Sequence, residues 1–407
     1  MTPPALSRRQ AVLIIALCVA IFAVGQFHRA SGAVFAPILA DRFALTATLT
    51  GALVSAMFFA TILFQAPFGA ALDRFGLRPV VTLSLVSIAL GTMVFAISST
   101  YGQAVAGRAI IGVGSACMGA ATHVIVARAF PTRDFGYVNG LVVGLGGIGG
   151  LIGTYPLALA LETAPFPAVF SAAAALILAS AGAAFMMFSD ARFRKPERSE
   201  VAASLGYLDL LRLAEFRRIL ALAAVTFAPI VTVTGVWGGP YLRDVHGMTA
   251  EAAGALLLIW YLATASGGLI YGWFERKALR RSRVIGASVL ISICCFSLLA
   301  AFSFENLVAP SVIMCVMVFC QQFYIPLGAH MRRVAPPASL GRASTLLMLV
   351  SVGAIPLMQT GFGAILDAAT LFGSPVEGGY RIAFAAVAGL IALCGLIYRG
   401  ARSVDGE

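Results

Sequence analysis

Twelve apolar runs, each long enough to cross a membrane as a helix, divide this 407-residue chain. About 20 apolar residues in helical form span the ~30 Å hydrocarbon core of a bilayer. The first six runs cover residues 11–38, 48–70, 79–98, 102–127, 136–160 and 166–188. The second six cover residues 218–242, 250–274, 284–303, 307–329, 342–366 and 379–399. We therefore predict an all-α membrane protein with twelve transmembrane helices in two six-helix halves.

The composition argues against other broad classes of protein. The chain is 60% hydrophobic and 11% charged, whereas soluble domains are about 45–50% apolar and about 25% charged. An outer-membrane barrel would need ~10-residue segments of alternating polarity, and the sequence has none. It also lacks a metal-ligand cluster, a nucleophile–base pair and a phosphate loop. We therefore predict neither an enzyme nor a bound metal or other cofactor.

The basic residues lie in alternate loops. With the N-terminus in the cytoplasm, most of the 28 Lys and Arg residues fall on the inner side, and only Arg42, Arg243 and Arg381 fall outside. Cytoplasmic loops of membrane proteins carry such an excess. The distribution accounts for the net charge of +11 without a nucleic-acid partner. It predicts a multi-pass protein of the bacterial inner membrane with both termini in the cytoplasm.

Two pairs of similar loops indicate that the halves are repeats. Residues 128–136 (RAFPTRDFG) and 333–341 (RVAPPASLG) share the spacing of Arg, Pro and Gly, and residues 73–78 similarly match 275–280. We divide the chain into an N-terminal bundle (1–188), a cytoplasmic linker (189–217) and a C-terminal bundle (218–407). Internal repeats of this kind place a substrate site between the halves, near the middle of the bilayer.

Two motifs carry a resemblance to a known family. The first, in the loop after the second run, has the pattern G-x3-D-R-x-G-x-R and consists of Gly69, Asp73, Arg74, Gly76 and Arg78. The second, on the fourth run, has the pattern R-x3-G-x-G and consists of Arg108, Gly112 and Gly114. With the twelve runs and the repeat, these residues resemble the major facilitator superfamily of transporters.

The resemblance implies a transporter that works by alternating access. It implies that Gly69 lets the second span approach the eleventh, and that Asp73 latches the inner side against the positive end of the eleventh helix. Arg74 and Arg78 would face lipid headgroups or acidic partners, and the motif of Arg108 would serve gating. On the fifth run, glycines recur at small-xxx-small spacing, which we expect to be structural: Gly136, Gly140, Gly144, Gly146, Gly149, Gly150 and Gly153.

Arg29 and Arg108 are the two charged residues well inside the apolar runs, and no Asp or Glu accompanies them there. A cation in hydrocarbon is costly, so it indicates a functional site. A planar guanidinium suits two-point capture of a carboxylate or phosphate. Because the second motif accounts for Arg108, we predict that Arg29, assisted by His28, binds an anionic substrate. An arginine satisfied by backbone carbonyls is the alternative.

Further polar residues are candidates for the same cavity. Trp237 lies in a Gly- and Pro-rich stretch of the seventh run, where a weakened helix suits a gate. The tenth run contributes Gln321, Gln322 and Tyr324. His28 and His123 are candidates for proton coupling, because histidine changes charge near neutral pH. A structural, hydrogen-bonded histidine is the alternative for each.

We predict a monomeric secondary transporter that moves a small, anionic solute across the inner membrane. The chain loosely resembles a bacterial permease branch grouped with sugar-phosphate and nitrate carriers. A proton-coupled efflux antiporter for drugs or metabolites is the alternative, although the fifth run lacks the Gly-Pro step that such antiporters carry. A transporter-like membrane receptor is a third possibility. The direction of flux and the coupling ion stay open.

Overall fold

The computed structural model describes residues 7–188, 206–276, 281–336 and 339–399. In these residues all regular structure is helical, and twelve helical segments are long and apolar enough to cross a membrane. Each of the twelve apolar runs corresponds to one of these segments. The prediction of an all-α protein with twelve membrane spans is confirmed.

The chain divides into two compact units. The first takes in Met1–Val34 and Leu53–Arg198, and the second takes in Phe35–Ala52 and Ser199–Glu407. The sequence-based boundary assigned residues 35–52 to the N-terminal bundle, whereas the structure packs them with the second unit. The reason is a set of hydrogen bonds and ion pairs described below. Residues 189–205 of the predicted linker lie outside the described residues.

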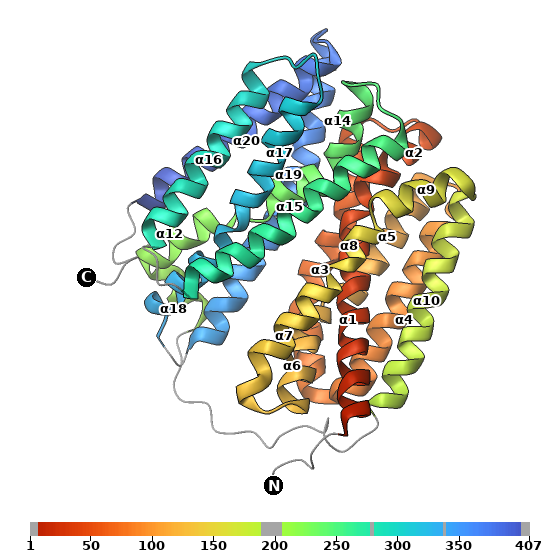
Figure 1. Cartoon of the computed structure of the whole chain (residues 1–407), viewed down its shortest axis with the longest axis vertical. Coiled ribbons are helices and arrows are strands. Elements are labelled where there is room, and N and C mark those ends of the chain that lie inside the picture. Colours follow the sequence, from red (N-terminus) through yellow and green to blue (C-terminus); the bar gives the residue numbers. More distant parts are fainter. Residues whose placement is uncertain (1–6, 189–205, 277–280, 337–338, 400–407) are drawn as a thin grey trace. The chain divides into compact units, whose positions relative to one another are not determined.

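The first unit is a bundle of long helices (Figure 1). Its helices are α1 (Arg8–Ala30), most of α3 (Ala47–Phe75), α4 (Leu77–Ala96), α5 (Tyr101–Ser115), α6 (Met118–Ala129), α7 (Thr132–Gly146), α8 (Ile148–Ile152), α9 (Tyr155–Thr163) and α10 (Phe166–Met187). α4 packs against α5 and α10, and α1 packs against α7 and α8. α1 begins at a capping box in which Ser7 and Gln10 each satisfy the backbone N–H of the other.

The second unit begins with most of α2 (Gly32–Phe43) and the first turn of α3. Its remaining elements are α11 (Tyr207–Arg212), α12 (Ala214–Ala223), α13 (Ala228–Thr232), the π-helical turn η2 (Val233–Trp237), α14 (Gly238–Asp244), α15 (Ala250–Arg276), α16 (Arg281–Ala301), α17 (Val308–Cys320), the 3-10 turn η3 (Gln321–Phe323), α18 (Tyr324–Val334), α19 (Leu340–Leu371) and α20 (Val376–Arg399). α16 packs along α20, and α19 packs against α20 and α13.

Several spans are interrupted where the sequence weakens the helix. The first span changes from α1 to α2 at Ser31, and Pro37 follows within α2, where its ring removes a backbone donor. The seventh span contains the π-helical turn η2, which coincides with the predicted Gly- and Pro-rich stretch around Trp237. Single π-helical turns inside helices are frequent at functional sites. Both interruptions lie beside residues singled out from the sequence.

Candidate functional site

Arg108 is completely buried in the first unit, where it joins three helices. From α5, its Nη1 donates to the carbonyl of His28 in α1, and its Nη2 donates to the carbonyl of Val54 in α3, both at 3.2 Å. A guanidinium suits this role because its donors are held in a rigid fork. Arg108 is therefore held by backbone carbonyls. The sequence indicated that role as the alternative for Arg29.

His28 is buried beside Arg108, and its protonation can be deduced from its neighbours. The hydroxyl of Thr92 donates its one proton to the carbonyl of Ile88 at 2.7 Å. The 3.2 Å contact between that hydroxyl and His28 Nε2 therefore requires a proton on Nε2. Nδ1 of the neutral ring is then an acceptor, and it has no hydrogen-bond partner among the described residues. A proton-carrying role would add a second positive charge beside Arg108.

Arg29 differs from Arg108 in being half-buried. It lies in the last turn of α1, two residues before the interruption at Ser31, and its Nη1 donates to Gln26 Oε1 at 3.3 Å. Its side chain keeps some exposed surface at the point where the first span is interrupted. The structure brings His28 and Arg108 together, and Arg29 follows His28 in the chain.

The candidates in the second unit are mainly engaged with neighbouring groups of the protein. Trp237 is buried, and its Nε1 donates to the carbonyl of Gln359 at 2.9 Å. Gln321 is buried too, and with its amide nitrogen turned inward it donates to the carbonyls of Val225 and Thr226 at 3.0 and 3.2 Å. These bonds favour positioning roles for both residues.

Gln322 and Tyr324 are half-buried. Gln322 donates to the carbonyl of Val318 in its own span at 3.4 Å, and the Tyr324 ring packs 4.6 Å from that of Phe227. Both keep some exposed surface for a ligand.

In the first unit, His123 is exposed and contacts the carbonyl of Gly119 within its own helix at 2.7 Å.

The motif after the second span forms the turn between α3 and α4. Gly76 has a φ of +84°, a conformation that a side chain would strain. Arg78 donates to the carbonyl of Phe185 at 2.9 Å, and its guanidinium lies 3.9 Å from the centre of the Phe185 ring. Arg78 therefore packs on α10, whereas the sequence predicted that it would face lipid headgroups or acidic partners. Arg74 is exposed, and a Cβ at Gly69 would meet nothing within 4 Å. The Asp73 side chain lies outside the described part, so the inner latch stays a prediction.

The glycines of the second motif let helices approach closely. A Cβ at Gly112 would fall on the Met57 carbonyl oxygen of α3, and one at Gly114 on the Ser84 carbonyl oxygen of α4. The motif therefore packs α5 closely against α3 and α4, and this packing determines how deeply Arg108 is buried in the first unit.

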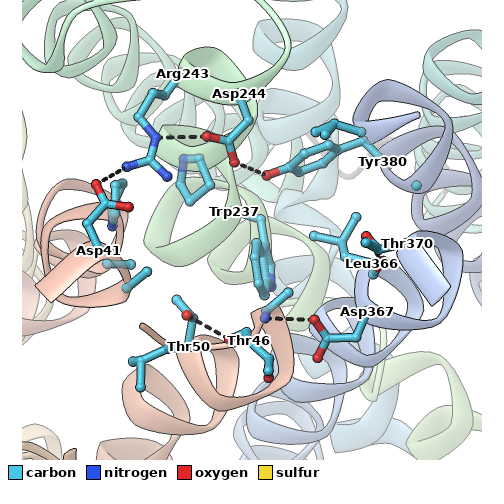
Figure 2. Close-up of a pocket in the computed structure, with 18 of the residues that line it drawn as sticks. Asp41, Thr46, Thr50, Trp237, Arg243, Asp244, Leu366, Asp367, Thr370 and Tyr380 are labelled. Atoms are coloured by element: carbon cyan, nitrogen blue, oxygen red, sulfur yellow. Dashed lines mark hydrogen bonds and ion pairs between the residues drawn. The ribbon is translucent and has the colours of Figure 1, made fainter. Parts of the chain in front are cut away.

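At one end of the second unit, a network of polar side chains surrounds a cavity of about 340 Å³ (Figure 2). Arg243 of α14 donates from Nη1 to Asp41 of α2 at 2.9 Å and from Nε to Asp244 at 2.7 Å. Tyr380 of α20 donates to the other oxygen of Asp244 at 3.4 Å. Exposed ion pairs contribute about 0–1 kcal/mol, so the Arg243–Asp41 pair is a weak tie.

Asp367 makes the stronger connection in this network. Its two carboxylate oxygens accept the backbone N–H groups of Ala47 and Thr48, each at 2.8 Å. These groups belong to the first turn of α3, whose N–H groups have no partner within the helix. Asp367 is therefore an N-cap supplied from α19. Close packing supports it, because a Cβ at Gly51 would lie 2.6 Å from the Gln359 carbonyl oxygen.

His246 follows α14 near this network. Burial lowers its pKa below the usual value, and the charge of Glu377 partly opposes the shift. Because a histidine of ordinary pKa is already mostly neutral at pH 7, His246 adds little positive charge beside Arg243. The network thus combines the carboxylates of Asp41, Asp244 and Asp367 with the guanidinium of Arg243.

We expect the Asp367→Asn substitution to loosen the first turn of α3. An amide offers one acceptor where the carboxylate offers two, and loss of an N-cap costs about 0.5–2 kcal/mol. Hydrogen exchange measured by mass spectrometry should be roughly 2- to 30-fold faster at the amides of Ala47 and Thr48. Thr370→Val on the same helix, whose hydroxyl bonds within α19, is the control. Unchanged exchange in the Asn variant would contradict the cap.

Sequence reasoning missed a buried histidine in the second unit. His330 of α18 is fully buried, with Nδ1 2.9 Å from the Tyr398 hydroxyl of α20 and Nε2 3.3 Å from Glu215 Oε1 of α12. The three side chains fasten three helices together at one end of the unit. A histidine directly after the tenth run was a visible signal, whereas its pairing with Glu215, 115 residues away, was not.

Among the described residues, twelve spans in two compact helical units, with an arginine buried among three of the spans, define a multi-pass membrane protein. The chain matches the Major Facilitator Superfamily over residues 15–358, and it belongs to that family. The resemblance seen in the motifs is thereby confirmed, and the family consists of transporters rather than enzymes.

Known relatives agree with this assignment. The chain is 24% identical to the uncharacterized transporter YybO of Bacillus subtilis, over 95% of this chain and 92% of the relative. It is 22% identical to a hexuronate transporter of the same organism, over 74% of each chain. Among solved structures, a D-xylose-proton symporter shares the fold with a TM-score of 0.76 at 14% identity, over 98% of this chain and 99% of that one.

Proposed function

We propose that this transporter carries a small anionic solute by alternating access and that Arg29 binds the anion. The observation that carries the proposal is the difference between the two arginines within the spans. Arg108 is fully buried and bonded to carbonyls of α1 and α3, whereas Arg29 is half-buried beside the interruption of the first span. Binding energy from a charged hydrogen bond is greatest where water is partly excluded.

The hexuronate relative supports an anionic substrate, because a hexuronate carries a carboxylate. Gln322 and Tyr324 are the second-unit residues that we propose as further ligand contacts, with His28, Trp237 and Gln321 in positioning roles. We further propose a monomer in the bacterial inner membrane with both termini in the cytoplasm. Proton-coupled efflux of drugs or metabolites is the second candidate function, and a membrane receptor is the third.

Thermal stability of the purified protein, measured against a panel of solutes, tests the proposal. A solute that binds the folded state raises the melting temperature. The panel pairs hexuronates, sugar phosphates and nitrate with uncharged sugars. We expect at least one anion to stabilise the protein. The Arg29→Gln substitution should lower the affinity for that anion by about 10- to 150-fold, which is the contribution of one charged hydrogen bond.

Two controls keep the result specific. Arg29→Lys should restore part of the affinity, and Arg42→Gln at the far end of the same span should leave it unchanged. Full retention of anion binding by Arg29→Gln would refute the role of Arg29. Stabilisation by lipophilic cations alone, or binding without flux in proteoliposomes, would favour the exporter or the receptor.

A further inference from the structure

A second cavity, of about 400 Å³, lies between α16 and α20 in the second unit. The two helices pack side by side along their length (Figure 1). Most of the lining is apolar and includes Val289, Leu290 and Ile293 of α16 and Leu396 of α20. Leu290 and Leu396 are more than half exposed in a protein that belongs to the bilayer, so this groove opens toward lipid.

The length of the groove matches one leaflet of a membrane. On α16 it runs from Ser282 to Ile293, a rise of about 16 Å along the helix axis. Half of the ~30 Å hydrocarbon core is about 15 Å. The groove is therefore as long as one leaflet of acyl chains is thick. Its volume is in the range of ligand pockets, about 300–1,000 Å³.

One end of the groove is polar and positively charged. Ser282 and Arg399 line this end, and Arg283 lies exposed in the same first turn of α16. None of the described lining residues is acidic. The positive-inside distribution assigns this end to the cytoplasmic surface, where anionic lipid headgroups lie. Basic pockets between spans on that side are suited to such headgroups.

We propose that this groove binds an anionic phospholipid of the inner leaflet. One acyl chain lies between α16 and α20, and the phosphate is bound by Arg399 and Ser282. A second protein copy is a poorer occupant, because a groove of this size offers much less than the ~1,200 Å² that stable interfaces bury. The lipid would also contact Tyr398, which lines the groove and whose hydroxyl lies 2.9 Å from buried His330. Lipid binding thus reinforces the helix end held by His330.

Two glycines shape the groove. A Cβ at Gly395 would lie 2.9 Å from Val289 Cγ1, so this glycine lets α20 pack closely on α16. A Cβ at Gly286 would meet nothing within 4 Å, so it would point into open space in the groove. A large side chain at Gly286 can therefore fill the groove without displacing backbone.

Native mass spectrometry of the purified full-length protein tests the proposal. Wild type is titrated with dioleoyl phosphatidylglycerol, with dioleoyl phosphatidylcholine, and with glycerol 3-phosphate, which has the phosphate but no acyl chain. The variants are Gly286→Phe, which fills the groove, and Arg399→Gln, which removes the charge. Gly389→Phe is the control, because Gly389 lies exposed on α20 with nothing within 4 Å and does not line the groove.

We expect wild type and Gly389→Phe to bind phosphatidylglycerol more tightly than phosphatidylcholine. Gly286→Phe should lose tight binding of phosphatidylglycerol. Arg399→Gln should reduce the preference for phosphatidylglycerol about fivefold, which is the effect of one surface arginine. Glycerol 3-phosphate should bind far more weakly. Equal binding by Gly286→Phe and the control, or an undiminished preference in Arg399→Gln, would overturn the proposal. Equal binding of glycerol 3-phosphate would assign the site to free phosphates instead. Since Arg399 is exposed, its variant decides the question even if Gly286→Phe fails to fold.

Discussion

Gly149→Leu is expected to prevent the first unit from folding. A Cβ at this position would fall on the backbone of Ala23, its nearest atom being the carbonyl oxygen. Gly149 is buried in α8, where α8 packs on α1. Only helix backbone could move to make room, so the cost exceeds the 1–3 kcal/mol usual for an overpacked core. The yield of monodisperse protein in size-exclusion chromatography should fall nearly to zero.

Gly144→Leu is the matched control for this prediction. Gly144 lies on the same span, is exposed, and a Cβ there would meet nothing within 4 Å. Its leucine variant should purify in near wild-type yield. If Gly149→Leu purified equally well and kept the wild-type melting temperature, the close approach of α8 to α1 would be incorrect.

Sequence periodicity predicted the glycine-rich packing of the fifth span but not which of its glycines contact another helix. The small-xxx-small spacing identified the fifth span as rich in packing glycines. It did not separate Gly149, which meets backbone, from Gly140 and Gly144, which meet open space. That difference depends on which face of the span turns toward α1. The span is interrupted at Gly147 and Gly153, and a regular 3.6-residue pattern does not continue through such interruptions.

The spans themselves were predictable, because length and hydropathy alone determine what can cross a bilayer. The polar contacts were predictable only where a residue was unusual by itself, as with Arg29 and Arg108. Asp367 directly follows the predicted run of residues 342–366, but nothing in the surrounding sequence points to the N–H groups of Ala47 and Thr48, about 320 residues earlier. Such pairings depend on tertiary packing, which also moved residues 35–52 into the second unit.

Arg108→Gln is expected to lower the melting temperature sharply while Arg29→Gln leaves it near the wild-type value. Arg108 makes two charged hydrogen bonds between helices, each worth about 1.5–3 kcal/mol, and glutamine has neither the charge nor the reach to replace them. We therefore expect a loss of about 3–6 kcal/mol in the free energy of unfolding. Arg29 is half-buried and donates to Gln26 on its own helix, so we expect its loss to cost much less stability than loss of the interhelical bonds of Arg108.

Arg108→Lys distinguishes the geometry of the fork from its charge. A lysine keeps the positive charge, but its single ammonium cannot reach both carbonyls as the planar guanidinium does. It should recover less than half of the lost stability. Thermal unfolding of the three variants in one detergent, with anion binding measured on the folded fraction, gives the comparison. Arg108→Gln should lose stability and Arg29→Gln should lose binding. If Arg108→Gln were as stable as wild type, the two carbonyl contacts would not hold α1 and α3 to α5.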